Sequence, residues 1–259
     1  MIGLFDSGLG GLTVVRQVRR RLPRHDLVFF ADQAHVPYGE RTTEDLHRLL
    51  EHNIELLDAR GVDTIVAACN TSCAIAQRYG WPQSRALVLD LIESAAIAVE
   101  RAGYRRVGVV ATSATARSGA YAHAIRARVS GAEVYEVAAP SLVPLVEAGK
   151  LAGDEPARAV AEVIAELPRS LDAVILACTH YPLLDLHFAN VLGSNVARLD
   201  PAEVQAERAA MVVTERMVPA NGGAMPFITN SDATTFAARI SEVMGIAMPS
   251  VERLEPLAL

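Results

Sequence analysis

Cysteine and aromatic residues are scarce in this chain of 259 residues. Only three cysteines occur, and no two of them have the spacing of a zinc knuckle, so we expect no metal site. Aromatic residues make up 5% of the chain, whereas hydrophobic residues of all kinds reach 51%, with much alanine and valine. That composition is typical of a sheet covered by helices, and the length is enough for one large domain or two small ones.

Strong charge and a transmembrane run are also lacking. The net charge of −6 and the pI of about 5.7 argue against a nucleic-acid partner. No apolar run reaches transmembrane length, so we expect no membrane partner. Residues 2–5 already have a strand pattern, which predicts that there is no signal peptide. We therefore expect a cytoplasmic protein with reduced thiols.

Apolar runs of strand length alternate with helical patterns along the whole chain. Strands are predicted at residues 2–5, 27–32, 64–69, 86–90, 106–112, 133–139, 173–178, 196–200, 227–230 and, as an edge strand, 251–254. The helices between them include residues 115–129, 140–149 and 201–218, the last followed by a loop at 219–223. Such regular alternation predicts an α/β fold with parallel sheets.

Two stretches share one design, a buried strand that ends in cysteine and two polar residues. The first ends in Cys-Asn-Thr at residues 69–71, and the second in Cys-Thr-His at residues 178–180. Ligands of α/β proteins bind at the carboxyl ends of the strands. One such stretch in each half of the chain predicts two similar lobes that face one cleft.

A cysteine at a strand end is more often a buried small residue than a catalyst. Chemistry is favoured here because a helix follows both Cys69 and Cys178, and a helix N-terminus lowers the pKa of a thiol. Cys73, one turn into its helix, fits the inert interpretation. His180, two residues after Cys178, is either a packed core histidine or a general acid and base.

A glycine-rich loop follows the first predicted strand. A strand, Gly8-Leu9-Gly10 and a helix are typical of dinucleotide binding, but Thr13 occupies the third glycine position. A tight turn is therefore the simpler interpretation, and the helix amides could hold a carboxylate instead. Asp6 would then be an acid-base partner at the cleft edge, and Ser7 a hydrogen-bonding hydroxyl.

Two further segments offer polar groups near predicted strand ends. Thr112 and Thr115 lie one helical turn apart, and their hydroxyls could donate to a carboxylate or cap the helix. Pro37 and Gly39 flank Tyr38 in a fixed turn that can expose backbone groups.

Together these motifs resemble the glutamate racemases of the aspartate/glutamate racemase superfamily. The resemblance rests on residues 6–13, 36–39, 69–71, 117–121 and 178–184, which follow the family's order. It implies a cofactor-independent amino-acid racemase with two similar α/β lobes, mainly parallel sheets flanked by helices, and the active site in the cleft between them. It also implies that the enzyme supplies D-glutamate for peptidoglycan and forms a homodimer.

The resemblance also assigns lobes and residues. The first lobe would comprise residues 1–92 plus 205–259, and the second residues 93–204. Cys69 and Cys178 would be the two catalytic bases. The other implied site residues are Asp6 and His180, as assisting groups that also contact substrate, and Ser7, Pro37, Tyr38, Gly39, Asn70, Thr71, Thr112, Thr115 and Thr179, as substrate contacts beside the two thiols. The chain departs from the family's usual residues at His35 and Pro201.

Two alternatives stay open. One is a racemase of the same superfamily that acts on aspartate or another acidic amino acid. The other is a nucleotide-binding domain with inert cysteines, which would bind a dinucleotide at the Gly8 loop and show no turnover.

Overall fold

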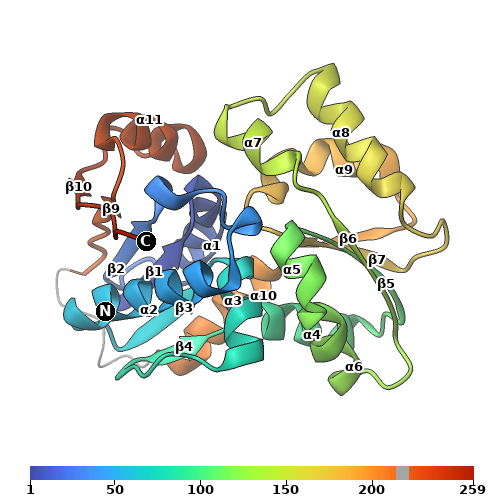
Figure 1. The fold of residues 1–259 in the computed structure, drawn as a ribbon, viewed down its shortest axis with the longest axis horizontal. Coiled ribbons are helices and arrows are strands. Elements are labelled where there is room, and N and C mark those ends of the chain that lie inside the picture. Colours follow the sequence, from blue (N-terminus) through green and yellow to red (C-terminus); the bar gives the residue numbers. More distant parts are fainter. Residues whose placement is uncertain (214–221) are drawn as a thin grey trace.

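Two parallel sheets organise the computed structural model, which describes residues 1–213 and 222–259 (Figure 1). The first sheet has the strand order β10-β9-β2-β1-β3-β4 and the second the order β6-β5-β7-β8. The strands are β1 (Ile2–Asp6), β2 (Leu27–Ala31), β3 (Thr64–Ala67), β4 (Leu87–Leu89), β5 (Arg106–Ala111), β6 (Glu133–Ala138), β7 (Ala173–Ala177), β8 (Ala197–Leu199), β9 (Phe227–Thr229) and β10 (Val251–Arg253). Every pairing between them is parallel, which confirms the predicted fold class.

Helices cover the faces of both sheets (Figure 1). They are α1 (Leu12–Arg21), α2 (Thr43–Ala59), α3 (Asn70–Tyr79), α4 (Leu91–Ala102), α5 (Ser113–Ser118), α6 (Ala120–Arg128), α7 (Leu142–Glu147), α8 (Asp154–Ala165), α9 (Asp185–Leu192), α10 (Pro201–Val212) and α11 (Ala233–Met244). Because helices lie on both faces, the central strands β1, β2 and β7 are buried along their whole length. None of the helices that the structure describes is long and apolar enough to cross a membrane.

The C-terminal segment completes the first sheet. Strand β9 pairs with β2, and β10 lies outside β9 as the predicted edge strand. Phe29 of β2 holds this addition in place, because its ring packs edge-on against Phe227 at 6.5 Å and, tilted by 43°, against Phe236 of α11 at 6.3 Å. We call the part around the first sheet the first lobe and the part around the second sheet the second lobe. The boundaries at residues 92/93 and 204/205 stay a prediction.

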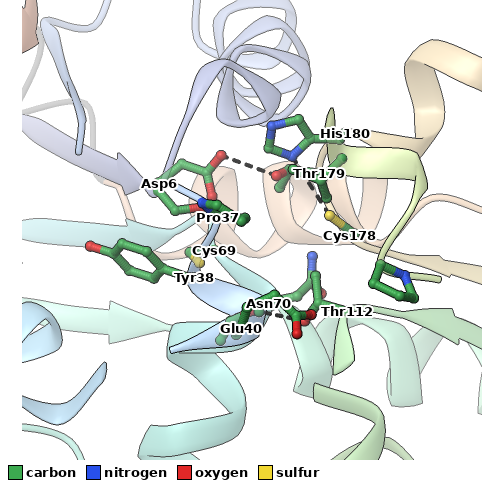
Figure 2. A pocket seen from close by; sticks show the side chains of 15 residues that line it. Asp6, Pro37, Tyr38, Glu40, Cys69, Asn70, Thr112, Cys178, Thr179 and His180 are labelled. Carbon is green, nitrogen blue, oxygen red and sulfur yellow. Dashed lines mark hydrogen bonds between the residues drawn. The ribbon is translucent and has the colours of Figure 1, made fainter. Parts of the chain in front are cut away.

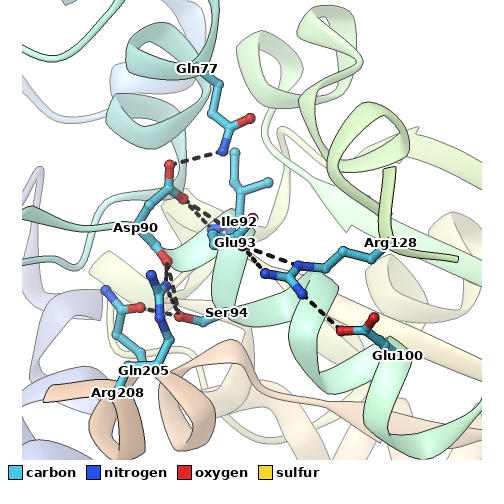
Figure 3. Close-up of polar contacts among 9 residues, drawn as sticks. All are labelled: Gln77, Asp90, Ile92, Glu93, Ser94, Glu100, Arg128, Gln205 and Arg208. Carbon is cyan, nitrogen blue, oxygen red and sulfur yellow. Dashed lines mark hydrogen bonds and ion pairs between the residues drawn. The ribbon is translucent and has the colours of Figure 1, made fainter. Parts of the chain in front are cut away.

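Two helices connect the sheets, and a polar network joins them (Figure 3). Helix α4 leads from β4 to β5, and α10 follows β8. The Gln205 side chain, on α10, hydrogen-bonds to Ser94 of α4 and donates to the Leu89 carbonyl at 2.8 Å. Arg208 donates to the Asp90 carbonyl and to Ser94, each at 2.8 Å. The relative position of the lobes therefore depends on contacts between α4 and α10.

Three helix predictions differ from the structure. The helix expected at residues 115–129 is two helices, because Gly119 adopts a left-handed conformation with φ of +66° between α5 and α6. The helix expected at 140–149 is limited to α7. The one expected at 201–218 ends at Val212, since Val213 has extended backbone. The remaining residues 214–218, with 219–221 of the predicted loop, lie outside the described residues.

Candidate active site

A pocket of about 440 Å³ lies where the carboxyl ends of strands from both sheets meet (Figure 2). Asp6 ends β1, Thr112 follows β5 and Cys178 follows β7 directly, while Cys69 comes two residues after β3. The lining residues are Asp6, Ser7, Pro37, Tyr38, Gly39, Glu40, Cys69, Asn70, Thr71, Thr112, Pro140, Val143, Cys178, Thr179 and His180. The structure thus brings together every predicted site residue except Thr115. Glu40, Pro140 and Val143 are lining residues that sequence reasoning missed.

Thr115 lies one layer behind the pocket. Its hydroxyl is 3.0 Å from that of Thr112 and 3.4 Å from that of Thr71, and the Thr71 and Thr112 hydroxyls are 2.9 Å apart. Thr112 also caps α5, which is one of the two roles considered for it, and donation to a carboxylate stays a prediction. Since Thr71 belongs to the first lobe and Thr112 to the second, this hydroxyl cluster links the two lobes at the pocket wall.

Tyr38 and Asn70 line the pocket, but the Tyr38 hydroxyl and the Asn70 side-chain oxygen are hydrogen-bonded to other residues of the chain. The Tyr38 hydroxyl donates to the Asp32 carboxylate and accepts from the Asn53 amide at 3.1 Å, so it is engaged outside the pocket. The Asn70 side-chain oxygen accepts from the Tyr121 hydroxyl. Its amide nitrogen is the group left to donate toward a bound molecule.

Cys69 is buried in the pocket wall just before α3, with 3% of its surface exposed. Burial, followed by the negative charge of Asp6, raises the pKa of the Cys69 thiol from 9.0 to about 12. We expected the helix N-terminus to lower this pKa, and that expectation is wrong for Cys69. The loss of water around the sulfur outweighs the helix and the hydrogen bonds of Ser72.

Cys178 belongs to a chain of three polar side chains. Its sulfur is 3.6 Å from Nδ1 of His180, and Nε2 of His180 is 2.6 Å from Oε1 of Glu147. Burial disfavours the charged form of His180, but its contacts with Cys178 and Glu147 prevail and raise the pKa of His180 well above its ordinary value. Burial likewise opposes the charge on Glu147, yet its hydrogen bond with His180 lowers the pKa of that carboxyl. The pair is therefore an imidazolium and a carboxylate.

Glu147 is a functional candidate that sequence reasoning missed. It is the last residue of α7, where a polar residue is common and predicts no function. Its distance along the sequence from His180 matches no known motif. Only the packing of α7 against the turn after β7 brings the two side chains together.

Asp6 has one engaged oxygen and one free oxygen. Its Oδ2 accepts from the Gly11 amide at 2.6 Å and from the Thr179 hydroxyl at 3.0 Å (Figure 2). Its Oδ1 is buried and has no hydrogen-bond partner among the described residues. Burial raises the pKa of Asp6 from 3.8 to about 6, although the positive charge of His180 opposes this. A carboxyl with that pKa can hold or release a proton near neutral pH.

The glycine-rich loop is shaped by contact between the lobes. A Cβ atom at Gly10 would lie 2.5 Å from Nδ1 of His180, and one at Gly8 would lie 2.4 Å from Oε1 of Glu147. The Leu9 amide donates to Glu147 at 3.2 Å. The loop needs glycine because the second lobe approaches it closely, and its amides already bind carboxylates of this chain. These contacts argue against the nucleotide-binding alternative.

Comparison with known proteins gives the family. The sequence profile described as Asp/Glu/Hydantoin racemase matches residues 12–209. A glutamate racemase from Gloeobacter violaceus is 41% identical over 239 residues, which is 92% of this chain and 89% of that protein. This chain belongs to the glutamate racemase family.

Solved glutamate racemases share the fold along almost the whole chain. The enzyme from Francisella tularensis, in complex with D-glutamate, superposes with a TM-score of 0.88 at 28% identity, covering 98% of this chain and 97% of that one. The enzyme from Thermus thermophilus, in complex with beta-chloro-D-alanine, gives 0.82 at 35% identity, with coverage of 98% and 96%. The predicted two-lobed α/β fold and the predicted isomerase class are confirmed.

Proposed function

We propose that this chain interconverts L- and D-glutamate with Cys69 and Cys178 as two bases that act on opposite faces of the substrate. One observation carries the proposal: a buried cysteine from each lobe lines the same pocket. Racemisation requires a group that removes the Cα proton from one face and a group that returns a proton to the other. Two facing thiols provide this symmetry, because one is the base while the other is the acid.

The pocket offers hydrogen-bond donors for the developing charge. When the Cα proton leaves, the adjacent carboxylate becomes enolate-like and gains negative charge. Amides at Ser7, Asn70 and Thr179 and the Thr112 hydroxyl are the donors that would stabilise it, in a pocket lined mostly by buried residues. Their places at helix and turn starts favour the binding of an anion.

The two thiols are prepared in different ways. Cys178 is next to the His180 imidazolium, whose Nδ1 lies 3.6 Å from the sulfur and can donate a proton there. Cys69 carries a thiol with a pKa of about 12, which burial and then the negative charge of Asp6 raise. The ammonium group of a bound amino acid adds positive charge at this point, which offsets Asp6 and makes the Cys69 thiolate accessible. Asp6 and His180 are thus the assisting groups of Cys69 and Cys178, respectively.

Pyridoxal phosphate is not needed in this account. Enzymes that use it hold it as a Schiff base with a lysine. The only lysine of the sequence is Lys150, an exposed residue after α7 that pairs with Glu155 at 2.8 Å. It does not line the pocket.

We further propose that the product, D-glutamate, is made in the cytoplasm for peptidoglycan. We also propose that the enzyme is a homodimer, which light scattering would test.

A circular-dichroism assay tests the substrate and the cofactor requirement together. Protein stripped of pyridoxal phosphate should convert L-glutamate and D-glutamate at comparable overall rates, and L-aspartate far more slowly. Faster conversion of aspartate would favour the alternative within the superfamily. Activity that disappears on stripping and returns with pyridoxal phosphate would exclude the thiol mechanism.

A further inference from the structure

A buried chain of hydrogen bonds leads away from the pocket wall. It begins at Tyr38, which lines the pocket and whose hydroxyl points away from the two cysteines (Figure 2). That hydroxyl donates to Oδ2 of Asp32, and Oδ1 of Asp32 is 2.5 Å from Nδ1 of His35. Nε2 of His35 is 2.9 Å from the carbonyl oxygen of Leu257. The hydrogen bonds therefore join the pocket wall to a residue that lies 222 positions after His35 in the sequence.

The directions of these hydrogen bonds follow from the chemistry of the partners. Burial, followed by the negative charge of Asp32, raises the pKa of Tyr38 well above its ordinary value, so the hydroxyl keeps its proton and donates it. The Asp32 carboxylate and the Leu257 carbonyl can only accept. The His35 ring therefore joins two acceptors through two N–H groups, which an imidazolium provides.

Water has little access to these groups. The exposed fraction is 0% for Asp32, 2% for Tyr38 and 7% for His35. Asp32 also accepts from the Asn230 amide, and the Tyr38 hydroxyl accepts from the Asn53 amide at 3.1 Å. A buried polar network fixes the positions of its members, because the loss of a partner leaves a group without water or protein to bind.

Residues 254–259, which follow β10 and which we call the tail segment, have a fixed place on the first lobe. The Leu254 amide donates to a carbonyl of β9 at 2.8 Å, and the Arg48 guanidinium of α2 donates to the Ala258 carbonyl at 2.9 Å. The side chain of Leu257 is half-buried against the hydrophobic core. The tail segment is therefore a firm attachment for the His35 ring.

From these contacts we propose that the tail segment positions the pocket wall for glutamate through His35, an inference that rests on the proposed function. The wall residues Pro37, Tyr38 and Gly39 follow His35 in the same turn, and the His35 carbonyl accepts from Nε of Arg41 at 2.5 Å. His35 does not itself line the pocket, so it is a positioning residue. A wall that shifts binds the substrate and the transition state less well by the same factor, which raises KM and changes kcat little.

Steady-state racemisation of glutamate by His35→Ala, by Leu257→Gly and by the double variant tests this inference. We expect KM to rise about ten-fold in His35→Ala and about three-fold in Leu257→Gly, while kcat stays within about two-fold of that of the natural chain. The double variant should have the KM of His35→Ala, because the tail segment acts through His35 and the two effects are not additive. KM does not depend on the folded fraction of the protein, so a variant that is only less stable keeps its KM.

Leu259→Gly is the matched control, because it makes the same substitution in the tail segment at a side chain that is 42% exposed. Its KM should stay within about two-fold of that of the natural chain. The inference is overturned if KM is unchanged in His35→Ala or in Leu257→Gly, or if the two effects multiply in the double variant. It is also overturned if Leu259→Gly raises KM as much as Leu257→Gly, or if kcat of His35→Ala falls by a larger factor than KM rises.

A failure of the proposed function would look different. The natural chain itself would then show no turnover of glutamate. Calorimetric titration with D-glutamate would in that case measure the affinity of the same variants in place of KM, with the same expected order and the same contradicting results.

Discussion

Asp6 and Cys69 show how burial sets the chemistry at the scale of single residues. Water is excluded from both side chains, and each therefore holds its proton more tightly than it would in solution. The two groups are also coupled, because a negative Asp6 makes a negative Cys69 less favourable. The protonation state of Cys69 therefore depends on that of Asp6.

We expect Asp6→Asn to reduce turnover by about 10²–10⁴-fold, while the affinity for glutamate changes much less. The carboxyl that can hold or release a proton next to Cys69 is lost, but an amide oxygen can still accept from Gly11 and Thr179. Steady-state kinetics in both directions measure this. A variant with an unchanged turnover number would contradict the role of Asp6.

The same variant should be more stable than the natural chain above neutral pH. The folded pKa of about 6 exceeds the ordinary value of 3.8, so the stabilising contribution of protonated Asp6 is complete below about pH 4 and is lost as the pH rises through 6. Two pKa units correspond to roughly 3 kcal/mol. Urea unfolding of both proteins at pH 4.5 and pH 8 measures this difference. The free energy of unfolding of Asp6→Asn, relative to that of the natural chain, should rise by roughly 2 kcal/mol from pH 4.5 to pH 8. A difference that does not vary with pH would contradict the raised pKa.

At the scale of elements, the turn between β1 and α1 is the part of the first lobe that must fit the second. We expect Gly10→Ala to lower turnover by roughly 10²-fold, because the new methyl group would meet His180 and Thr179 and push the lobes apart. Overpacking of this kind also costs about 1–3 kcal/mol of stability.

Gly61→Ala is the control for that substitution. Gly61 has φ of +70°, and no atom lies within 4 Å of the place that an added methyl group would take, so alanine strains the backbone there without touching another element. Its stability should fall by about 1 kcal/mol, and its turnover should stay the same. Equal turnover in Gly10→Ala and the natural chain would show that the loop does not set the lobe spacing.

The elements that could be predicted from the sequence are those that local patterns determine. Apolar runs located every strand, and the polar residues after four of them located the pocket. Glu147 could not be found in this way, because its partner His180 is 33 residues away and meets it only through packing. The raised pKa of Cys69 was missed for a related reason, because it is decided by what surrounds the sulfur in space and a nearby helix end does not report it. The break at Gly119 is different, since it is a local property of a left-handed glycine that helical spacing alone does not reveal.

At the scale of the whole molecule, the two thiols keep their positions across the pocket only if the lobes keep their relative position. The contacts between α4 and α10 hold that position, and Gln205 is fully buried at their centre (Figure 3). We expect Gln205→Ala to cost about 2–4 kcal/mol of stability, since it leaves a cavity and removes the donor to the Leu89 carbonyl.

Urea unfolding measures this loss, with Gln83→Ala as the control because Gln83 is exposed. That control should stay within about 0.5 kcal/mol of the natural chain. A loss below about 1 kcal/mol in Gln205→Ala would mean that other contacts hold the lobes together.

The most direct test of the two-base account is a pair of single cysteine variants, Cys69→Ser and Cys178→Ser. Every complete racemisation uses both thiols, so neither variant should racemise glutamate in either direction. Elimination of a β-leaving group needs only the base, so each variant should retain it for one enantiomer.

The family resemblance assigns Cys69 to the D-enantiomer and Cys178 to the L-enantiomer. Elimination assays with both enantiomers of a β-chloro substrate should therefore show that Cys178→Ser accepts only the D-form and Cys69→Ser only the L-form. The account is contradicted if both variants prefer the same enantiomer, or if either one keeps appreciable racemase activity, as a single base that swings between the two faces would allow.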